Sequence, residues 1–224
     1  MIPVRALWQM LRRPSVKWSV LSLLGFGFVG GILFWGAFNT GMEATNSLSF
    51  CISCHEMRDT VYQEYRDTVH YSNRTGVRAV CSDCHVPKDW SHKMLRKAKA
   101  SFEVWGKLVG TIDTPEKFEA RRIVMATHEW ERFKANGSRE CRNCHDFDAM
   151  SPTVQKNRNY RRHMAAKAEG KTCIDCHKGI AHQLPREYIA QQEALEAARE
   201  AAAAASAAAA ASAASAGATA ASTP

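Results

Sequence analysis

The most informative shortage in this 224-residue sequence is that of large aliphatic side chains between about residues 45 and 188. A segment of that length is an ordinary single domain, and such a domain normally fills its interior with leucine, isoleucine and valine. Here the same segment carries all eight cysteines and all nine histidines of the chain. We therefore expect something other than side chains to fill much of the interior.

The sequence also has no convincing run of alternating apolar and polar residues, which is the pattern of a half-buried β-strand. Apolar residues instead recur at helical spacing and predict helices at about 88–109, 114–137 and 153–170. In the second of these, Thr114 is followed by Pro115, and proline is favoured at the first helical position. The predicted fold class is therefore mainly α.

Charge is absent from residues 18–38, a run of 21 mostly apolar residues. As a helix with a rise of about 1.5 Å per residue, this run would be about 32 Å long, enough to cross the hydrocarbon core of a bilayer. A cleaved signal peptide is the alternative, but its apolar region normally has about 7–15 residues, and no A-x-A cleavage site follows promptly. We therefore predict an uncleaved transmembrane anchor at 18–38.

The charges on the two sides of this run are unequal. Segment 1–17 has no acidic residue and four basic ones: Arg5, Arg12, Arg13 and Lys17. Residues 39–50 carry only Glu43. The positive-inside rule then leaves the N-terminus in the cytoplasm. The chain is predicted to be a single-pass protein of the bacterial inner membrane, with its domain in the periplasm.

No cysteine lies outside one repeated motif. The chain has four C-x-x-C-H motifs: Cys51, Cys54 and His55; Cys81, Cys84 and His85; Cys141, Cys144 and His145; Cys173, Cys176 and His177. This is the attachment motif of c-type haem, in which two thiols bond the vinyl groups of one haem and the adjacent histidine reaches its iron. The motifs predict four covalently bound haem c groups, which would also supply the missing interior.

Four disulfides or zinc sites are alternative uses of paired cysteines in an exported protein. Neither chemistry requires a histidine directly after each pair, whereas haem attachment does. The haem interpretation is favoured for that reason. We therefore predict that residues 45–188 form a small tetrahaem cytochrome c domain.

The spacing of the motifs indicates an internal repeat. Their first cysteines lie 30, 60 and 32 positions apart, so the domain divides into two dihaem halves. Histidines outside the motifs occupy similar places in both halves and are the candidate sixth ligands of iron: His70, His92, His163 and His182. His128 falls outside this pattern and is assigned a structural role.

Residues 189–224 differ from everything before them, since 18 of the last 28 residues are alanine. Arg186 to about Ala205 has high helix propensity but few large apolar side chains to bury. The tail is predicted to be helical and then mobile, with a spacer or docking arm as the functional alternative. The formal net charge of +8 is by itself compatible with nucleic acid, an anionic membrane surface or an acidic protein partner. Charge does not choose among these, but with a membrane anchor in the sequence no nucleic-acid partner is expected.

Together these features resemble the NapC/NirT family of membrane-anchored tetrahaem cytochromes. The resemblance rests on the anchor, the four motifs and three runs: Cys51–Met57 (CISCHEM), Asp113–Phe118 (DTPEKF) and Glu140–His145 (ECRNCH). It covers roughly residues 5–188 and is strongest toward the branch that supplies periplasmic nitrate reductase. The resemblance implies an electron-transport protein of nitrate respiration that oxidises menaquinol or ubiquinol. Its implied acceptor is a periplasmic nitrate reductase with a dihaem subunit.

For the first haem, the resemblance implies that Met57, two positions after the motif histidine, is the iron ligand. The opposite face of this haem would then be open to quinol. The alternative is that His55 binds the iron, as the histidine does in other motifs, while Met57 only packs.

For the remaining irons, the resemblance implies ligands that cross between the two halves. With the internal repeat, it implies these pairs: His182 with His145, His70 with His177, and His163 with His85. His92 would line the quinol pocket, contact the first iron weakly, or be an exposed helical histidine.

Lys97 and Glu103 resemble the lysine and the acid that this family has beside its first haem. Oxidising a quinol releases protons as well as electrons, so the Glu103 carboxylate would assist deprotonation. Lys97 would orient the ring oxygen or balance the charge of the acid. The alternative is that both side chains simply face solvent on a basic helix.

Three classes of function remain open to this sequence. A quinol-oxidising relay to a periplasmic reductase leads, with nitrite or trimethylamine-N-oxide reductase as the alternative acceptor. A terminal oxyanion reductase is disfavoured because its open haem would be the membrane-proximal one and no C-x-x-C-K motif is present, so no separate reductase activity is expected. A plain electron shuttle or haem-based sensor is the third class.

Overall fold

The computed structural model describes Arg5 and residues 16–220, with side chains described as far as residue 209. Most of the predicted basic segment 1–17, including Arg12 and Arg13, lies outside the described residues, as do the last four residues of the alanine-rich tail. The chain divides into two units, Met1–Phe50 and Cys51–Pro224, and each is described by itself.

The first unit contains helix α2 (Val20–Ala44), which includes most of the predicted anchor. It begins where the Ser19 hydroxyl accepts a hydrogen bond from the Ser22 backbone N–H, and it runs six residues past Phe38. This extension is stabilised at its end, because the Thr45 hydroxyl donates to the carbonyls of Gly41 and Met42. Within the described residues, α2 is the one helix long and apolar enough to cross a membrane.

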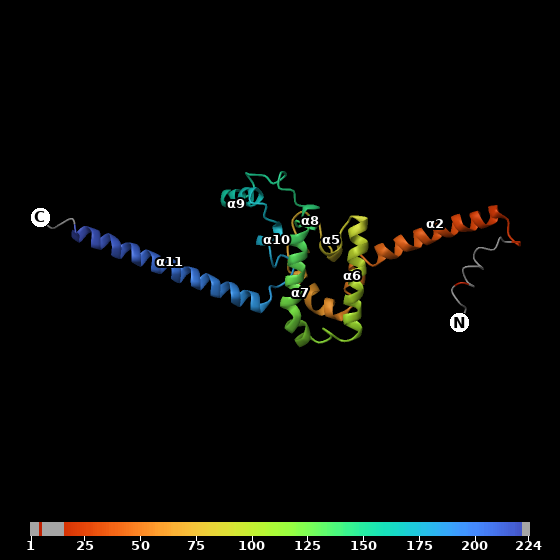
Figure 1. Ribbon diagram of the computed structural model, residues 1–224, viewed down its shortest axis with the longest axis horizontal. Helices are drawn as coiled ribbons and strands as arrows, with labels where there is room; N and C mark the ends of the chain where they lie inside the picture. The colour runs from red at the N-terminus through yellow and green to blue at the C-terminus, as the bar shows by residue number, and fades with distance from the viewer. Residues whose placement is uncertain (1–4, 6–15, 221–224) are drawn as a thin grey trace. The chain divides into compact units, whose positions relative to one another are not determined.

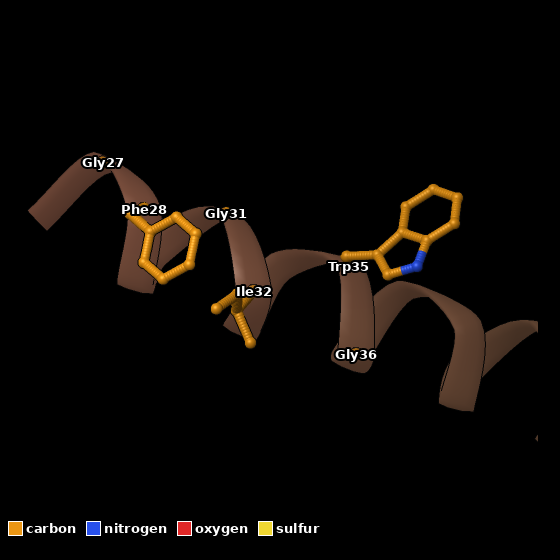
Figure 2. Close-up of a pocket in the computed structure, with 6 residues that line it drawn as sticks. All are labelled: Gly27, Phe28, Gly31, Ile32, Trp35 and Gly36. Atoms are coloured by element: carbon orange, nitrogen blue, oxygen red, sulfur yellow. The ribbon is translucent and has the colours of Figure 1, made fainter. Parts of the chain in front are cut away.

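Glycines shape one side of α2. Figure 2 shows a shallow hollow on the helix, where bare backbone lies between projecting side chains; its lining is Gly27, Phe28, Gly31, Ile32, Trp35 and Gly36. Apart from each glycine's chain neighbours and the nearby backbone of α2 itself, no described atom lies within 4 Å of the position that a Cβ would take at any of these three glycines. Every residue from Val20 to Gly36 is exposed, which is the state expected of a helix that presents apolar side chains to lipid.

The second unit is built of helices and turns, and no β-strand occurs among residues 16–220, which agrees with the predicted mainly α class. The helices after α2 are α3 (Leu48–Cys51), η1 (Met57–Val61, a π-helix), α4 (Tyr62–Arg66), α5 (Cys81–His85), α6 (Trp90–Leu108), α7 (Pro115–Ala135), α8 (Arg139–Arg142), α9 (Asn157–Ala168), α10 (Cys173–Cys176) and α11 (Arg186–Ala220). Four of the short ones, α3, α5, α8 and α10, carry cysteines of the motifs.

Helices α6 and α7 run in opposite directions in Figure 1, joined by a turn that contains Gly110 at φ 68°. Each begins at a side-chain cap: Asp89 accepts from the His92 N–H, and Thr114 accepts from the Lys117 N–H. Pro115 occupies the first turn of α7, as predicted. Capping residues and proline thus determine where both helices start.

Two helix boundaries differ from the predicted ones. α9 starts at Asn157 rather than near Thr153, because the preceding residues form a turn in which the Ser151 hydroxyl accepts from the backbone N–H of Thr153 and Val154. α11 continues to Ala220, beyond the predicted end near Ala205. Alanine has the highest helix propensity of all residues, so nothing in that composition ends the helix.

The polypeptide buries few large hydrophobic side chains of its own. Within the described residues these are Tyr65, Phe118 and Ile174. A domain of this size normally buries many more, so side chains alone do not form an ordinary core. Part of the interior is instead polar, since Arg122 is buried and its guanidinium pairs with the carboxylate of Glu64.

Candidate functional site

The second and fourth cysteine motifs each begin a short helix, α5 and α10, that brings its two thiols to one side. In α5 and α10 the residue before the second cysteine is an aspartate that caps its own helix. Asp83 accepts from the Val80 N–H at 2.8 Å, and Asp175 accepts from the Thr172 N–H at 2.8 Å. One helical turn separates the two cysteines of a motif, so both thiols lie on the same face. The second and fourth motifs therefore share one local structure, as the internal repeat predicts.

Neighbouring motifs in the sequence are also neighbours in space. A hydrogen bond with Cys81 lowers the pKa of the Cys51 thiol below its ordinary value, which places the first motif beside the second. Helices α5 and α8 pack against each other, which places the second beside the third. Burial and the nearby thiol of Cys173 raise the pKa of Cys141 to about 11, so the third lies beside the fourth. The four motifs thus follow one another in order.

Six histidine rings face one another in three pairs. Each pair joins one motif histidine to one histidine outside the motifs, with these distances between ring centres: His145 and His70 at 6.3 Å, His85 and His182 at 6.2 Å, and His177 and His163 at 5.9 Å. These are the second, third and fourth motifs. Each of them therefore has a second imidazole opposite its own.

The spacing of these rings fits an iron ion between them. Two imidazoles on opposite sides of one metal ion have ring centres about 6 Å apart, from metal–nitrogen bonds of about 2 Å and roughly 1 Å more to each ring centre. All three pairs have this spacing. No disulfide joins the eight cysteines, and residues 16–220 hold no group of three His, Cys, Asp or Glu side chains suited to a bare metal ion. The donor set fits haem rather than zinc.

The facing rings are not the pairs that the resemblance implies. His182 faces His85 instead of His145, because the Glu64 carboxylate accepts from the Gln183 N–H at 2.8 Å and Arg122 donates to the Gln183 carbonyl at 3.1 Å. These bonds fix the backbone beside His182. The six histidines that face one another are therefore combined differently from the pairs that the resemblance implies.

The other two pairs also differ from the implied ones. His163 faces His177 rather than His85, since α9 is joined directly to the fourth motif by a turn at Gly170, where φ is 66°. His70 then faces His145 rather than His177. Of the three pairs, only His163 and His177 thus come from adjacent chain segments, whereas His70 and His145 come from different halves of the domain.

Two of the facing histidines have their other ring nitrogen occupied. His85 Nδ1 lies 3.2 Å from the Glu129 carboxylate, and His163 Nδ1 lies 2.7 Å from the Gln155 amide oxygen. With Nδ1 bonded in this way, Nε2 is the nitrogen left for a metal. Arg132 donates to the same Glu129 oxygen at 2.9 Å and to the Cys84 carbonyl at 3.2 Å.

The first motif has different surroundings. His55 faces no other histidine ring among the described residues, and its Nε2 lies 3.3 Å from the Glu56 carboxylate. Glu56 is buried, and Lys107 Nζ donates to both of its oxygens at 2.8 and 2.9 Å. Burial raises the pKa of Glu56, but the hydrogen bonds and charge of Lys107 outweigh it and leave the pKa below its ordinary value. Met57 follows directly, at the start of the π-helix η1.

Comparison with known proteins decides the family. The chain matches the NapC/NirT cytochrome c family, N-terminal region, over residues 13–187. The chain belongs to this family. It is 60% identical to the cytochrome c-type protein NapC of Escherichia coli K12 over 81% of this chain and 90% of that protein. It is 59% identical to the denitrification system component NirT of Stutzerimonas stutzeri, over 82% of this chain and 92% of that protein.

A third relative has a different length. The cytochrome c-type protein TorC of Escherichia coli K12 is 47% identical over 81% of this chain but only 47% of its own. No solved structure matches the chain. Membership of the NapC/NirT cytochrome c family makes this an electron-transport protein with covalently bound haem c, and α2 fits its single membrane anchor.

The residues carried over for quinol lie on α6. Lys97 is half-buried, and its charge contributes to lowering the pKa of Cys51, which places it near the first motif. Glu103 is exposed and pairs with Arg96 at 2.8 Å. The buried acid beside the first motif is Glu56, with Lys107 as its cation. The sequence analysis did not identify the ion pair of Glu56 and Lys107.

Two further histidines are apart from the facing pairs. His92 is exposed in the first turn of α6, where its Nδ1 lies 2.5 Å from the Asp89 carboxylate that caps the helix. This is the exposed helical histidine among the three alternatives. His128 is exposed on α7, away from any histidine ring in the described structure.

Glu129, Arg132 and Gln155 were also missed as side chains near the facing histidines. Glu129 and Arg132 are three positions apart on a helix, and such pairs are common on solvated surfaces. Gln155 precedes His163 by eight positions with no motif to mark it. Only the folded structure brings these side chains to the imidazoles.

Proposed function

We propose that this protein oxidises quinol from the membrane pool and passes the electrons, through four covalently bound haem c groups, to a periplasmic terminal reductase. The observation that carries the proposal is the difference between the first motif and the other three. Three motifs have facing histidine pairs, as saturated relay sites require, whereas the first has none. A site without a second strong ligand is where a substrate can approach.

The residues that would hold the four groups follow from the geometry. Thioether bonds come from the eight motif cysteines. The axial pairs would be His85 with His182, His145 with His70, and His177 with His163. Bound haem supplies reversible one-electron chemistry at its iron. The polypeptide would hold each pair of imidazoles on opposite sides of one iron and keep successive haem sites close together. The proximity of successive motifs supports the second role.

At the first site, we assign the iron ligand to Met57 rather than His55. The support is that His55 Nε2, the nitrogen that binds iron in other motifs, is directed at the Glu56 carboxylate. Lys107 holds that carboxylate in place and neutralises its charge. Lys97 and Glu103 on the same helix would contact menaquinol or ubiquinol, with Glu103 accepting a hydroxyl proton and Lys97 orienting the ring oxygen.

The membrane topology follows from the anchor and its flanking charges. Helix α2 would cross the inner membrane once, with segment 1–17 in the cytoplasm and the haem domain in the periplasm. This orientation would give the domain access to a soluble periplasmic acceptor.

For the acceptor, we propose periplasmic nitrate reductase with its dihaem subunit. Support comes from the 60% identity to the cytochrome c-type protein NapC over 90% of that protein's length. Similar identity to NirT, and 47% identity to TorC, make a nitrite or trimethylamine-N-oxide reductase the alternative acceptor. A knockout complemented with this gene, and assayed for anaerobic growth on each oxyanion or on trimethylamine-N-oxide, would distinguish these acceptors.

The test of the relay is steady-state oxidation of a reduced menaquinone or ubiquinone analogue by the purified holoprotein, with an artificial electron acceptor. We expect turnover with quinol and no oxyanion reduction when dithionite is the donor. A protein that is reduced by dithionite but never by quinol would be a plain shuttle or sensor. Nitrite reduction with dithionite would make it a terminal enzyme.

A further inference from the structure

The facing histidines differ in what their remaining ring nitrogens contact. His85 Nδ1 faces a carboxylate, Glu129, at 3.2 Å. His163 Nδ1 faces a neutral amide, Gln155, at 2.7 Å. The corresponding nitrogens of His70 and His182 are buried, and neither has a side-chain acceptor among the described residues. Among these four imidazoles, His85 therefore has the one anionic acceptor.

Glu129 is held firmly in this position. Its side chain is 24% exposed, and Arg132 donates to its Oε2 through Nε at 2.9 Å. The same guanidinium donates to the Cys84 carbonyl and lies 4.3 Å from the centre of the Phe133 ring. Helix α7 thus holds the histidine and the second cysteine of one motif through a single ion pair.

A carboxylate and an amide act differently on a metal-bound imidazole. A charge-assisted hydrogen bond is stronger than a neutral one, and it makes the imidazole a better electron donor to its metal. Negative charge near the site also favours the oxidised, more positive iron. Arg132 offsets part of that charge, but it leaves the His85 bond to the carboxylate in place.

We propose that Glu129, fixed by Arg132, is a positioning residue that lowers the reduction potential of the iron held by His85 and His182. Gln155 occupies the corresponding place beside His163 and leaves the iron held by His163 and His177 at a higher potential. This inference rests on the ligand pairs of the proposed function. On this proposal, the Glu129 side chain accounts for the difference in reduction potential between the haem of the second motif and the haem of the fourth.

The test exchanges the two acceptors without changing their shape. Glu129→Gln removes the charge and keeps an acceptor oxygen, and Gln155→Glu does the reverse. Both variants of the full-length holoprotein are titrated potentiometrically with chemical mediators and followed by absorbance and EPR. The matched control is Glu131→Gln, which removes an exposed carboxylate two positions away on the same helix.

We expect Glu129→Gln to raise the potential of one haem, favouring its reduction about tenfold, or about 59 mV for one electron. Gln155→Glu should lower the potential of a different haem. The EPR g-values of the affected haem should shift together with its reduction potential. Glu131→Gln should change neither the reduction potentials nor the g-values. If Glu129→Gln moves no potential further than the control does, the proposal is wrong.

Two further outcomes are distinguishable. If Glu129→Gln fails to retain four haems, Gln155→Glu decides the question, and an unchanged set of potentials in that variant overturns the proposal. The titration uses chemical mediators and does not depend on quinol oxidation. If the variants show the expected shifts in reduction potential but the protein does not oxidise quinol, the proposed function is contradicted and the role of Glu129 still holds.

Discussion

The first C-x-x-C-H motif and the other three share one sequence pattern but place their histidines in different surroundings. His85, His145 and His177 each face a second imidazole at a distance that one iron ion would span. His55 faces the buried carboxylate of Glu56, which is held by Lys107. The comparison teaches that the motif determines where a haem is attached, whereas its axial ligands depend on what the rest of the fold brings to the histidine.

The largest effect should follow from removing a facing histidine. His182→Ala leaves His85 without its partner, so one low-spin EPR signal should disappear. Quinol oxidation should fall by more than the roughly 10–100-fold that loss of an outer hydrogen-bond partner typically causes. His128→Ala, an exposed histidine of α7, is the matched control and should behave as the wild type. An unchanged spectrum in His182→Ala would break the proposed pairing.

The next effect concerns the ion pair that fixes the backbone beside His182. Arg122 and Glu64 have side chains only 9% and 11% exposed, so Arg122→Met leaves a buried carboxylate without its partner. The free energy of unfolding should fall by about 3–5 kcal/mol, measured by chemical denaturation of the holoprotein. Arg121→Met changes an exposed neighbour and should cost far less. Equal losses in both variants would show that the pair does not stabilise this region.

A smaller, pH-dependent effect should separate the first motif from the others. The folded pKa of Glu56 lies below its ordinary value of 4.5, so its ionised form stabilises the fold above that pH. This stability should be lost as the pH falls through the lower folded pKa. In Lys107→Met, burial acts without an opposing cation and raises the pKa of Glu56, so the acid transition should move to higher pH. Thermal unfolding between pH 3 and about 7 measures this.

The matched control for that series is Lys99→Met, which removes an exposed lysine from the same helix. Its acid transition should coincide with that of the wild type. If the transition of Lys107→Met also stays at the wild-type pH, the ion pair with Glu56 does not control the charge beside His55.

The smallest effect should come from His55 itself. Because Met57 is the proposed ligand, His55→Ala should keep all four haems and the EPR signals of the wild type, with only a modest change in quinol oxidation. His145→Ala, the same change in the third motif, should lose one low-spin signal. If both variants lose a signal, His55 is a ligand and the first motif does not differ from the others.

Much of the fold could be predicted from the sequence because it depends on local patterns. Thr114 and Pro115 mark the start of α7 to the residue, since capping and proline act within one helical turn. The membrane anchor could be predicted because a long uncharged apolar run is recognised directly in the sequence. The start of α9 was placed too early because the turn at Ser151 depends on side-chain hydrogen bonds that no periodicity reveals.

The ligand pairs could not be predicted in the same way. Counting positions between motifs gives candidate histidines, His92 among them, but it does not show which rings meet, because many pairings satisfy the same count. Which rings meet depends on long-range contacts such as the bond between Glu64 and Gln183, which are far apart in the sequence. Glu129 and Glu56 escaped notice for a related reason, because an acid becomes a partner of an imidazole only when the fold brings the two side chains together.

EPR of the oxidised full-length protein, with its haems counted by mass spectrometry, tests the central claim most directly. We predict four covalently attached haems, of which three give low-spin signals of paired imidazoles and the fourth gives a signal of different ligation. Four equivalent paired-imidazole signals, or a mass that lacks the four haems, would contradict the account.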